Sequence, residues 1–214
     1  MKNKIRIFTA MAVVLMIFSS CATAEPEITA SATPMRGVWV ENTLINPFFG
    51  IRFDLPGDWW AMTPEGVEEM YLNGGYVLPP IGSEITSELY GLAETLGIVD
   101  LAAEHICEIH NVSITTRIMR LADDEADLTA KGFLMNIVTE FEESGIGGAN
   151  IEMYDGTVRI GLLDWHYADY IVPNMMHQRY FVNIDHGSRF VRGIIITNMF
   201  GDEFHDVLDM FRAY

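Results

Sequence analysis

Positive charge is scarce in this chain: 13 lysines and arginines stand against 30 aspartates and glutamates, which gives a formal net charge of −17. Proteins that bind nucleic acid neutralise its phosphates with lysine and arginine, so this composition argues against a nucleic-acid partner. Anionic lipid headgroups are disfavoured for the same reason. An acidic surface is compatible with cations or basic partners, although its commonest effect is solubility.

Cysteine is scarce as well, because the chain contains two, Cys21 and Cys107. If Cys21 carries a lipid, Cys107 has no partner within the chain, and the fold must stand without a disulfide. The simplest interpretation of Cys107 is a buried free thiol. The chain also lacks the G-x-S-x-G motif of serine hydrolases, the H-E-x-x-H motif of zinc proteases and any internal repeat.

No segment is apolar over a long enough stretch to span a membrane, but the N-terminus has the pattern of a bacterial signal peptide. Lys2, Lys4 and Arg6 form a basic start without acids, and a mainly apolar stretch of 12 residues follows over 7–18. A bilayer core of ~30 Å needs about 20 helical residues, so this stretch has the length of a signal h-region. Residues 1–20 are therefore expected to be a leader for export.

The cleavage region allows two interpretations. The run Phe18–Cys21, F-S-S-C, resembles the lipobox of bacterial lipoproteins, in which small residues precede the cysteine that takes the lipid, although the usual leucine is replaced by Phe18. Ala22–Ala24 matches instead the A-x-A pattern of ordinary signal peptidase. We favour the lipobox, because a cysteine directly after the h-region has no other obvious role. The mature protein would then begin at Cys21.

The mature chain is expected to be an extracytoplasmic domain on a tether. Its net charge changes from −17 to −20, because the leader takes three positive charges with it and no negative ones. Residues 21–36 are rich in alanine, serine, threonine and proline without apolar periodicity, which predicts a lipidated cysteine and a flexible tether. Residues 37–214 are expected to form one domain, either held at the membrane by lipid alone or secreted.

Periodic patterns predict a mixture of strands and helices. Thr63 and Pro64 indicate a helix start, the carboxylates of Asp123–Asp127 indicate another, and Asp202 is expected to begin a final helix with Phe211 in its apolar stripe. Short connections between the last strands favour an antiparallel sheet, so the expected fold is α+β, an α/β/α sandwich around a mainly antiparallel sheet. The expected strands are 37–42, 50–55, 98–103, 111–120, 151–160, 162–172, 179–185 and 189–198, with further helices at 83–96 and around 133–141.

The run Gly50–Trp59, G-I-R-F-D-L-P-G-D-W, resembles the opening G-I-x-F-x-L-P-x-x-W of small secreted proteins and lipoproteins with the PsbP-like fold. The end of the chain is similar in its order of long paired strands, a turn, a strand and a short helix. The resemblance implies an α/β/α sandwich over 37–214. It also implies a non-catalytic role, because the named members are a lumenal photosystem II subunit and a protein that binds a nuclear-transport GTPase. It implies no particular site residues.

The densest group of possible metal ligands is Glu104–His110, which holds His105, Cys107 and His110. Imidazole, thiolate and carboxylate are all ligands for a divalent metal. The spacing is poor, however, because on a strand His105 and Cys107 share one face while His110 points to the other. A metal-binding protein that uses this cluster is therefore an alternative, and a strand edge with an inward Cys107 is the simpler interpretation.

Two further groups are candidates for a site. Asp164 and His166 lie two residues apart on an expected strand, as in an Asp–His pair of a hydrolase, but no nucleophile motif accompanies them. Trp39, Trp59 and Trp60 are expected to form an aromatic patch for a ligand or partner, with at least one indole in the core.

The sequence as a whole favours a non-catalytic binding or accessory protein outside the cytoplasm. Its partner is expected to be a protein or small ligand at the cell surface, and no cofactor is expected unless the Glu104–His110 cluster binds a divalent metal. A metal-binding protein and a surface hydrolase using Asp164 and His166 remain the alternatives.

The lipobox assignment can be tested in cells. Globomycin blocks the peptidase that processes lipoproteins, so we expect an uncleaved precursor to accumulate in its presence, visible as a slower band on an immunoblot. Normal maturation under globomycin would instead place the cleavage after Ala24.

Overall fold

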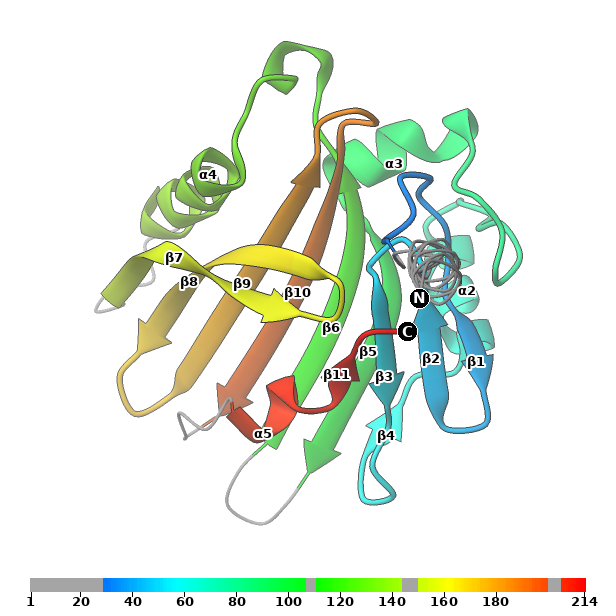
Figure 1. The fold of residues 1–214 in the computed structure, drawn as a ribbon, viewed down its shortest axis with the longest axis horizontal. Coiled ribbons are helices and arrows are strands. Elements are labelled where there is room, and N and C mark those ends of the chain that lie inside the picture. Colours follow the sequence, from blue (N-terminus) through cyan, green and yellow to red (C-terminus); the bar gives the residue numbers. More distant parts are fainter. Residues whose placement is uncertain (1–28, 107–110, 144–149, 200–204) are drawn as a thin grey trace, which may run out of the picture.

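Two antiparallel sheets form the body of the protein (Figure 1). The computed structural model describes residues 29–106, 111–143, 150–199 and 205–214. The larger sheet has seven strands in the order β4-β5-β6-β10-β9-β8-β7, and every neighbouring pair is antiparallel. Its strands are β4 (Trp60–Ala61), β5 (Ile98–Ile106), β6 (Asn111–Arg120), β7 (Asn150–Ile160), β8 (Leu163–Val172), β9 (Met176–Asp185) and β10 (Phe190–Met199).

The smaller sheet joins the beginning of the domain to its end. Its order is β1-β2-β3-β11, again antiparallel throughout. Because β11 pairs with β3, the two ends of the domain lie side by side (Figure 1). Its strands are β1 (Val38–Val40), β2 (Thr43–Asn46), β3 (Ile51–Asp54) and β11 (Phe211–Arg212).

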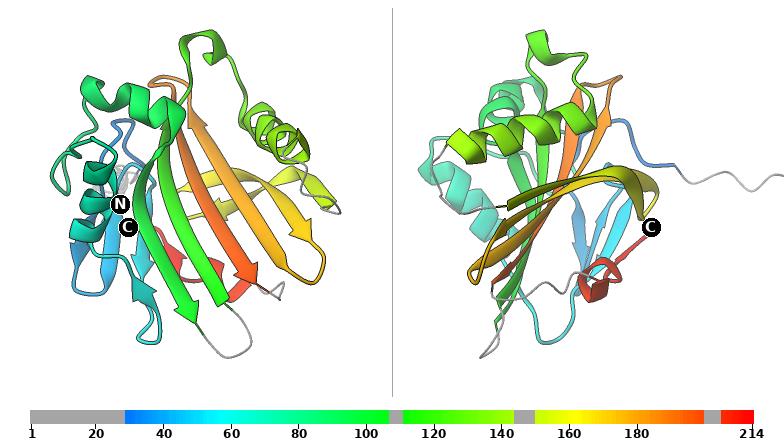
Figure 2. Two further views of the ribbon diagram at one scale, coloured as in Figure 1. Left: turned by 180° about the vertical axis from the view of Figure 1, so that it is seen from behind. Right: turned by 90° about the vertical axis from the view of Figure 1, so that its left-hand side faces the viewer.

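The helices are few and short. They are α2 (Pro64–Asn73), α3 (Tyr90–Thr95), α4 (Ala130–Glu143) and the single turn α5 (His205–Leu208), with 3-10 turns at Ser87–Leu89 and Asp123–Glu125. Seen from the side, α3 and α4 lie on one face of the seven-stranded sheet and the small sheet lies on the other (Figure 2). None of these described helices is long and apolar enough to cross a membrane.

The α+β class and the antiparallel sheet are confirmed. The sandwich expected from the sequence has a helical layer on each face, whereas the layer opposite α3 and α4 is the small sheet. The reason lies in the N-terminal part of the domain, where residues 38–54 form strands with an apolar face that packs on the large sheet.

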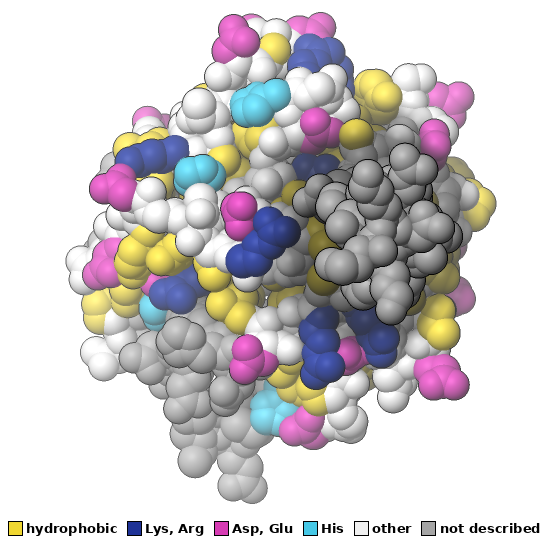
Figure 3. Space-filling model, viewed as in Figure 1, with side chains coloured by type: hydrophobic (Ala, Val, Ile, Leu, Met, Phe, Trp, Pro, Cys, Tyr) yellow, Lys and Arg dark blue, Asp and Glu magenta, His cyan; other side chains and the backbone are white. Residues whose placement is uncertain are grey.

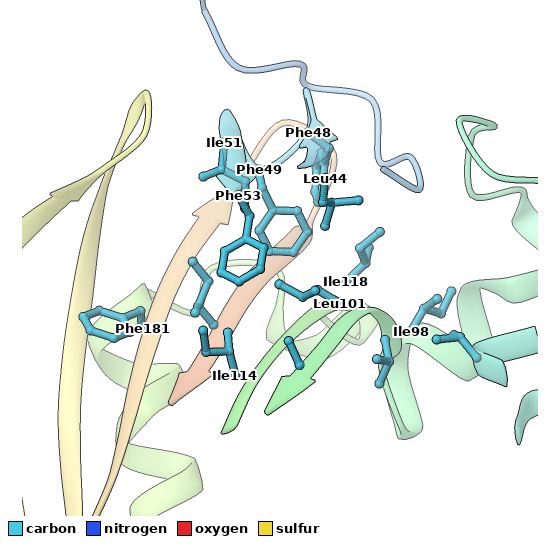
Figure 4. Packing of buried hydrophobic residues seen from close by; sticks show 14 of the residues in the cluster. Leu44, Phe48, Phe49, Ile51, Phe53, Ile98, Leu101, Ile114, Ile118 and Phe181 are labelled. Carbon is cyan, nitrogen blue, oxygen red and sulfur yellow. The ribbon is translucent and has the colours of Figure 1, made fainter. Parts of the chain in front are cut away.

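Strand alternation separates the two faces of the large sheet. On β10 the side chains of Phe190, Ile194 and Ile196 point toward the small sheet and are buried. They meet an apolar group from the small sheet and the loop between β2 and β3, so the main core lies between the sheets (Figure 4). That group consists of Leu44, Phe48, Phe49, Ile51 and Phe53.

A buried arginine links the two sheets and the segment that precedes them. Arg192 on β10 is 4% exposed, and its guanidinium lies 4.2 Å from the centre of the Phe48 ring. It donates hydrogen bonds to the carbonyl oxygens of Phe48 and Ser31 and to Asn183. Burial lowers the pKa of Arg192 to about 10, which still leaves it charged at neutral pH.

Residues 29–36, which the sequence pattern predicts to be part of the tether, also pack against the domain. Arg36 is 2% exposed and donates to Glu68 and to the carbonyl oxygen of Pro79. Met35 forms an isolated bridge with Glu84. The packed domain therefore begins before residue 37, and residues 21–28 of the expected tether, including Cys21, lie outside the described part of the chain.

A buried carboxyl fixes β5 to the small sheet. Asp100 sits at a register irregularity in β5 and accepts hydrogen bonds from Asn46 Nδ2 at 2.7 Å and Gly37 N at 2.9 Å. Asn46 in turn accepts from the amide of Phe49. Desolvation raises the pKa of Asp100 above its usual value, and these two donors only partly offset that effect.

Of the two predicted helix starts in the described chain, the one based on a capping residue is confirmed and the one based on a run of carboxylates is not. The predicted start of α2 is confirmed, because Thr63 Oγ1 accepts from Gly66 N and Pro64 is the first helical residue. The predicted start at Asp123–Asp127 is wrong. That run contains a 3-10 turn whose Asp123 pairs with Arg189, and α4 begins only at Ala130.

The predicted final helix is too long at its C-terminal end. Phe211 is not in a helical stripe but in β11, where it pairs with Phe53 on β3 and their rings lie 5.0 Å apart. Burial of two phenylalanines against the core outweighs the helical spacing of this short segment. Asp202, its expected cap, lies outside the described residues.

The β7–β8 hairpin closes the core from the far edge of the large sheet. The amide of Leu162 in its turn donates to the carbonyl of Gly50 at 2.9 Å. Gly161 has a φ of +59°, and a Cβ there would lie 2.3 Å from the same carbonyl oxygen. Only glycine permits this approach of one sheet to the other.

Gly161→Ala should therefore destabilise the protein by about 2–4 kcal/mol, from positive-φ strain together with displacement of the hairpin from Gly50. Chemical denaturation followed by circular dichroism would measure it. Gly156→Ala on β7 is the matched control, because a Cβ there meets nothing within 4 Å. We expect that variant to be as stable as the native chain or slightly more so, and equal effects of the two substitutions would contradict the close-contact argument.

Candidate functional site

A cleft of about 680 Å³ lies on the helical face of the large sheet. The helix α4 packs on β8 and β9, and α3 packs on β6. The face of β6 and β10 between these helices is left without a helical cover (Figure 2, left). The lining comes from the end of α3, from α4, and from β6, β10 and β9, which places the cleft where the helical layer is incomplete.

The floor of the cleft is a set of cross-strand rows. Arg117 on β6 lies beside Gly193 on β10, which lies beside Val182 on β9. Gly193 has no side chain to fill the middle of this row, and the end of Met119 occupies part of the space, 2.6 Å from where a Cβ of Gly193 would be. The row is therefore a depression with Arg117 on one side.

One end of the floor carries a chain of hydrogen bonds. The Tyr180 hydroxyl donates to Gln178 Oε1 at 2.7 Å, and Gln178 Nε2 donates to Thr197 Oγ1 at 3.0 Å. Burial raises the pKa of Tyr180 far above its usual value, so its hydroxyl stays protonated. Thr115 and Ile195 lie in the same row as Tyr180 and complete this part of the lining.

The helix α4 forms one wall, and a hydroxyl sets its start. Thr129 Oγ1 accepts from the amide of Gly132. The helix then turns Leu134, 1% exposed, onto the sheet. Neighbouring positions line the cleft with apolar and polar side chains in alternation: Phe133, Asn136, Ile137, Glu140 and Phe141.

The two arginines that line the cleft differ in whether they have an ion-pair partner. Arg120 pairs with Glu94 and lies 4.7 Å from the centre of the Tyr90 ring. The Arg117 guanidinium has no hydrogen bond or ion pair with any described residue, and its Nε is buried. Arg117 is therefore a cationic side chain of the cleft without an ion-pair partner among the described residues.

The polar groups of the lining are amides, hydroxyls, guanidinium groups and carboxylates. Among the described residues that line the cleft there is no histidine, cysteine or serine. Its hydroxyls come from threonines and from Tyr180, whose pKa is raised rather than lowered.

The structure separates the described members of the predicted metal cluster. Glu104 pairs with Trp60 of β4, whereas His105 is on the opposite face of β5 and stacks on Trp59 at 5.8 Å. His105 Nε2 lies 3.3 Å from a carboxylate oxygen of Asp58. Cys107 and His110 lie outside the described residues, and the described residues contain no group of three metal ligands.

The predicted aromatic patch is dispersed. Trp39 and Trp59 are half-buried and pack against the main core, while Trp60 on the edge strand β4 is 56% exposed. These three described indoles make no ring contact with one another.

The predicted Asp–His pair is not assembled either. Asp164 is exposed and lies 3.4 Å from the Arg159 guanidinium, and no ion pair joins it to His166 in the described structure. The Nδ1 of His166 is buried without a hydrogen bond to a described residue. Both side chains are on the helical face of β8, as predicted, but the geometry of a triad is missing.

A buried ion-pair cluster on the opposite face was not predicted. Asp169 on β8 is 1% exposed, and Arg179 on β9 donates to both of its carboxylate oxygens at 2.6 Å. The hydroxyl of Tyr154 donates to Asp169 at 3.1 Å, and His177 Nε2 lies 3.0 Å from it. Burial, with the carboxylates of Asp169 and Glu152 nearby, raises the pKa of Tyr154 to about 12. Because these charges satisfy one another, the cluster is structural.

A signal for this pair was present in the sequence. The turn at 173–175 joins β8 to β9, and counting outward from it places Asp169 opposite Arg179. The predicted second strand, 179–185, begins at Arg179 and gives this arginine no partner, whereas β9 begins at Met176.

Surface charge on the face of the small sheet does not point to another site. In the described part of that face, acidic side chains are scattered and basic ones lie among them (Figure 3).

Comparison with known proteins identifies no relative of this chain. No family model, no curated protein and no solved structure matches it.

The Asp169 cluster predicts a large effect of one neutral substitution. Asp169→Asn would leave the Arg179 guanidinium facing an amide in a buried place, which should lower the free energy of unfolding by about 3–5 kcal/mol. Asp164→Asn on the same strand removes an exposed partner of an arginine and should cost at most about 1 kcal/mol. Urea denaturation of both variants measures the difference in their free energies of unfolding. Comparable losses in the two variants would show that the Asp169–Arg179 pair contributes no more to stability than an exposed pair does.

Proposed function

We propose that the chain is an exported, lipid-anchored and non-catalytic binding protein whose ligand site is the cleft between α3 and α4. The observation that carries this proposal is the cleft itself, which is large enough for a small organic molecule and has both apolar walls and fixed polar groups. The leader-like N-terminus supports export from the cytoplasm. The lack of an assembled catalytic group in the described lining supports a binding role.

The anchor is proposed from the sequence pattern at Cys21. The described chain starts at residue 29, where the carbonyl oxygen of Thr29 accepts from the Tyr214 hydroxyl. A lipid on Cys21 would hold the protein near the membrane by a segment of only a few residues. Stable attachment requires more than one acyl chain, as bacterial lipoproteins have.

The resemblance of Gly50–Trp59 to PsbP-like proteins is part of the same proposal. In the structure this run forms β3 and the turn into β4, and its Ile51 and Phe53 are core residues of the small sheet. A PsbP-like relationship would agree with an accessory role without catalysis. Neither the metal-binding nor the hydrolase alternative gains an observation from the described residues.

The cleft can be tested with N-phenylnaphthylamine, a neutral apolar dye that fluoresces when it leaves water. We expect the chain from residue 22 onward, which contains every described element, to bind it saturably in a fluorescence titration. Asn136→Trp on α4 should fill the cleft. Loss of about 60 Å² of dye contact costs about 1.5 kcal/mol, so the affinity should fall about tenfold.

Met135→Trp is the matched control, because Met135 is 45% exposed, adjoins Asn136 and does not line the cleft. It should bind the dye as the native chain does. If the native chain fails to bind, or if both tryptophan variants bind equally well, the cleft is not the ligand site.

A further inference from the structure

Arg117 is the feature of the cleft that points to a class of ligand. It projects from the middle of β6 on the helical face, within the floor rather than on the rim. Its Nε is buried and has no acceptor among the described residues, so part of the guanidinium has lost water without gaining a hydrogen bond. The terminal nitrogens of the guanidinium also have no hydrogen bond or ion pair with a described residue, and they are the donors that a ligand in the cleft would contact.

The surroundings of Arg117 combine apolar and polar side chains. Met119 and Phe133 lie toward one end of the cleft, and the hydrogen-bonded chain of Tyr180, Gln178 and Thr197 lies toward the other, where the Phe141 ring packs 5.8 Å from that of Tyr180. A purely polar ion would leave the apolar walls exposed, and a purely apolar molecule would leave the guanidinium unsatisfied. The complement is an amphipathic molecule.

The remaining charges limit how negative that molecule can be. Glu94 is already paired with Arg120, but Glu125 and Glu140 also line the cleft, and neither has a cationic partner within ion-pair distance in the described structure. Each additional negative charge on a ligand beyond the one at Arg117 would be repelled by these carboxylates and by the strongly acidic chain as a whole.

We infer that the cleft selects small amphipathic molecules that carry a single anionic group, which the Arg117 guanidinium binds. The inference rests on the proposed function, because it assigns the ligand class of the same cleft. A carboxylate or a sulfonate can accept two parallel hydrogen bonds from the guanidinium, while the apolar body of the ligand lies along α4.

Two dyes that share one skeleton test the inference. Anilinonaphthalenesulfonate is N-phenylnaphthylamine with one sulfonate added, so it differs in the group that Arg117 would bind. In Arg117→Gln we expect the dissociation constant of the sulfonate to rise at least about tenfold, the effect of losing a charge-assisted hydrogen bond, while that of the neutral dye changes less than about twofold. Arg117→Lys keeps the charge but cannot donate two parallel hydrogen bonds, so it should weaken sulfonate binding, though less than Arg117→Gln does.

Arg159→Gln is the matched control, because it removes the same charge from an exposed residue of β7 outside the cleft. It should leave both dissociation constants unchanged. Undiminished sulfonate binding by Arg117→Gln, or an equal loss in Arg159→Gln, would overturn the inference while neutral-dye binding still supported the cleft. Failure of the native chain to bind the neutral dye would overturn the proposed function itself. Neutral-dye binding also reports whether Arg117→Gln is folded. If it is not, Arg117→Lys takes its place, and an unchanged sulfonate dissociation constant in that variant would overturn the inference.

Discussion

A wide antiparallel sheet has two faces that must be covered, and this constraint shapes the whole molecule. One face receives the small sheet, whose phenylalanines fill the space above β10, and the hydrogen bond from Leu162 to Gly50 closes that side at its edge. The other face receives two short helices. With 14 residues, α4 spans β8 and β9, and the six-residue α3 reaches β6. The cleft is the part of the second face that these helices leave uncovered, so it is a consequence of helix length rather than of a special loop.

The arginines in structural positions have hydrogen-bond or ion-pair partners within the protein, whereas the arginine of the candidate site does not have them among the described residues. Arg192 is enclosed by carbonyl oxygens and an aromatic ring, and Arg179 is held by both oxygens of Asp169. Each joins elements that are distant in the sequence or at a sheet edge, and each is satisfied within the protein. Arg117 differs because its guanidinium lies in a cleft and has no such partner in the described structure. In a chain this rich in carboxylates, an arginine side chain without an ion-pair contact in the described structure is a specific arrangement and not a matter of composition.

Much of the secondary structure could be predicted from periodicity, because the long strands alternate and hairpin turns separate them. Errors arose where local signals compete with packing, as at Phe211, which joins a strand because Phe53 offers a buried partner. The site was harder to predict. In β6 the alternation of Val112, Ile114 and Ile118 indicates one apolar face, and Arg117 lies on the other. Whether that face is open, covered or cleft-forming depends on where α4 lies, and no spacing within β6 carries this information. The histidine-rich cluster showed the reverse problem, since residues adjacent in sequence are placed on opposite faces of β5.

The acidic surface and the basic floor of the cleft have complementary consequences for binding. Long-range repulsion slows the approach of any anion to a protein with this net charge, and salt screens it within about 10 Å at moderate ionic strength. Contact with Arg117 is short-range and partly shielded from water, so it is weakened much less by salt. A ligand with one charge and a large apolar body loses little to the repulsion and gains from both the walls and the guanidinium. A small polyanion would suffer more repulsion and gain nothing from the walls, so the acidity of the chain would add to the selectivity proposed for Arg117.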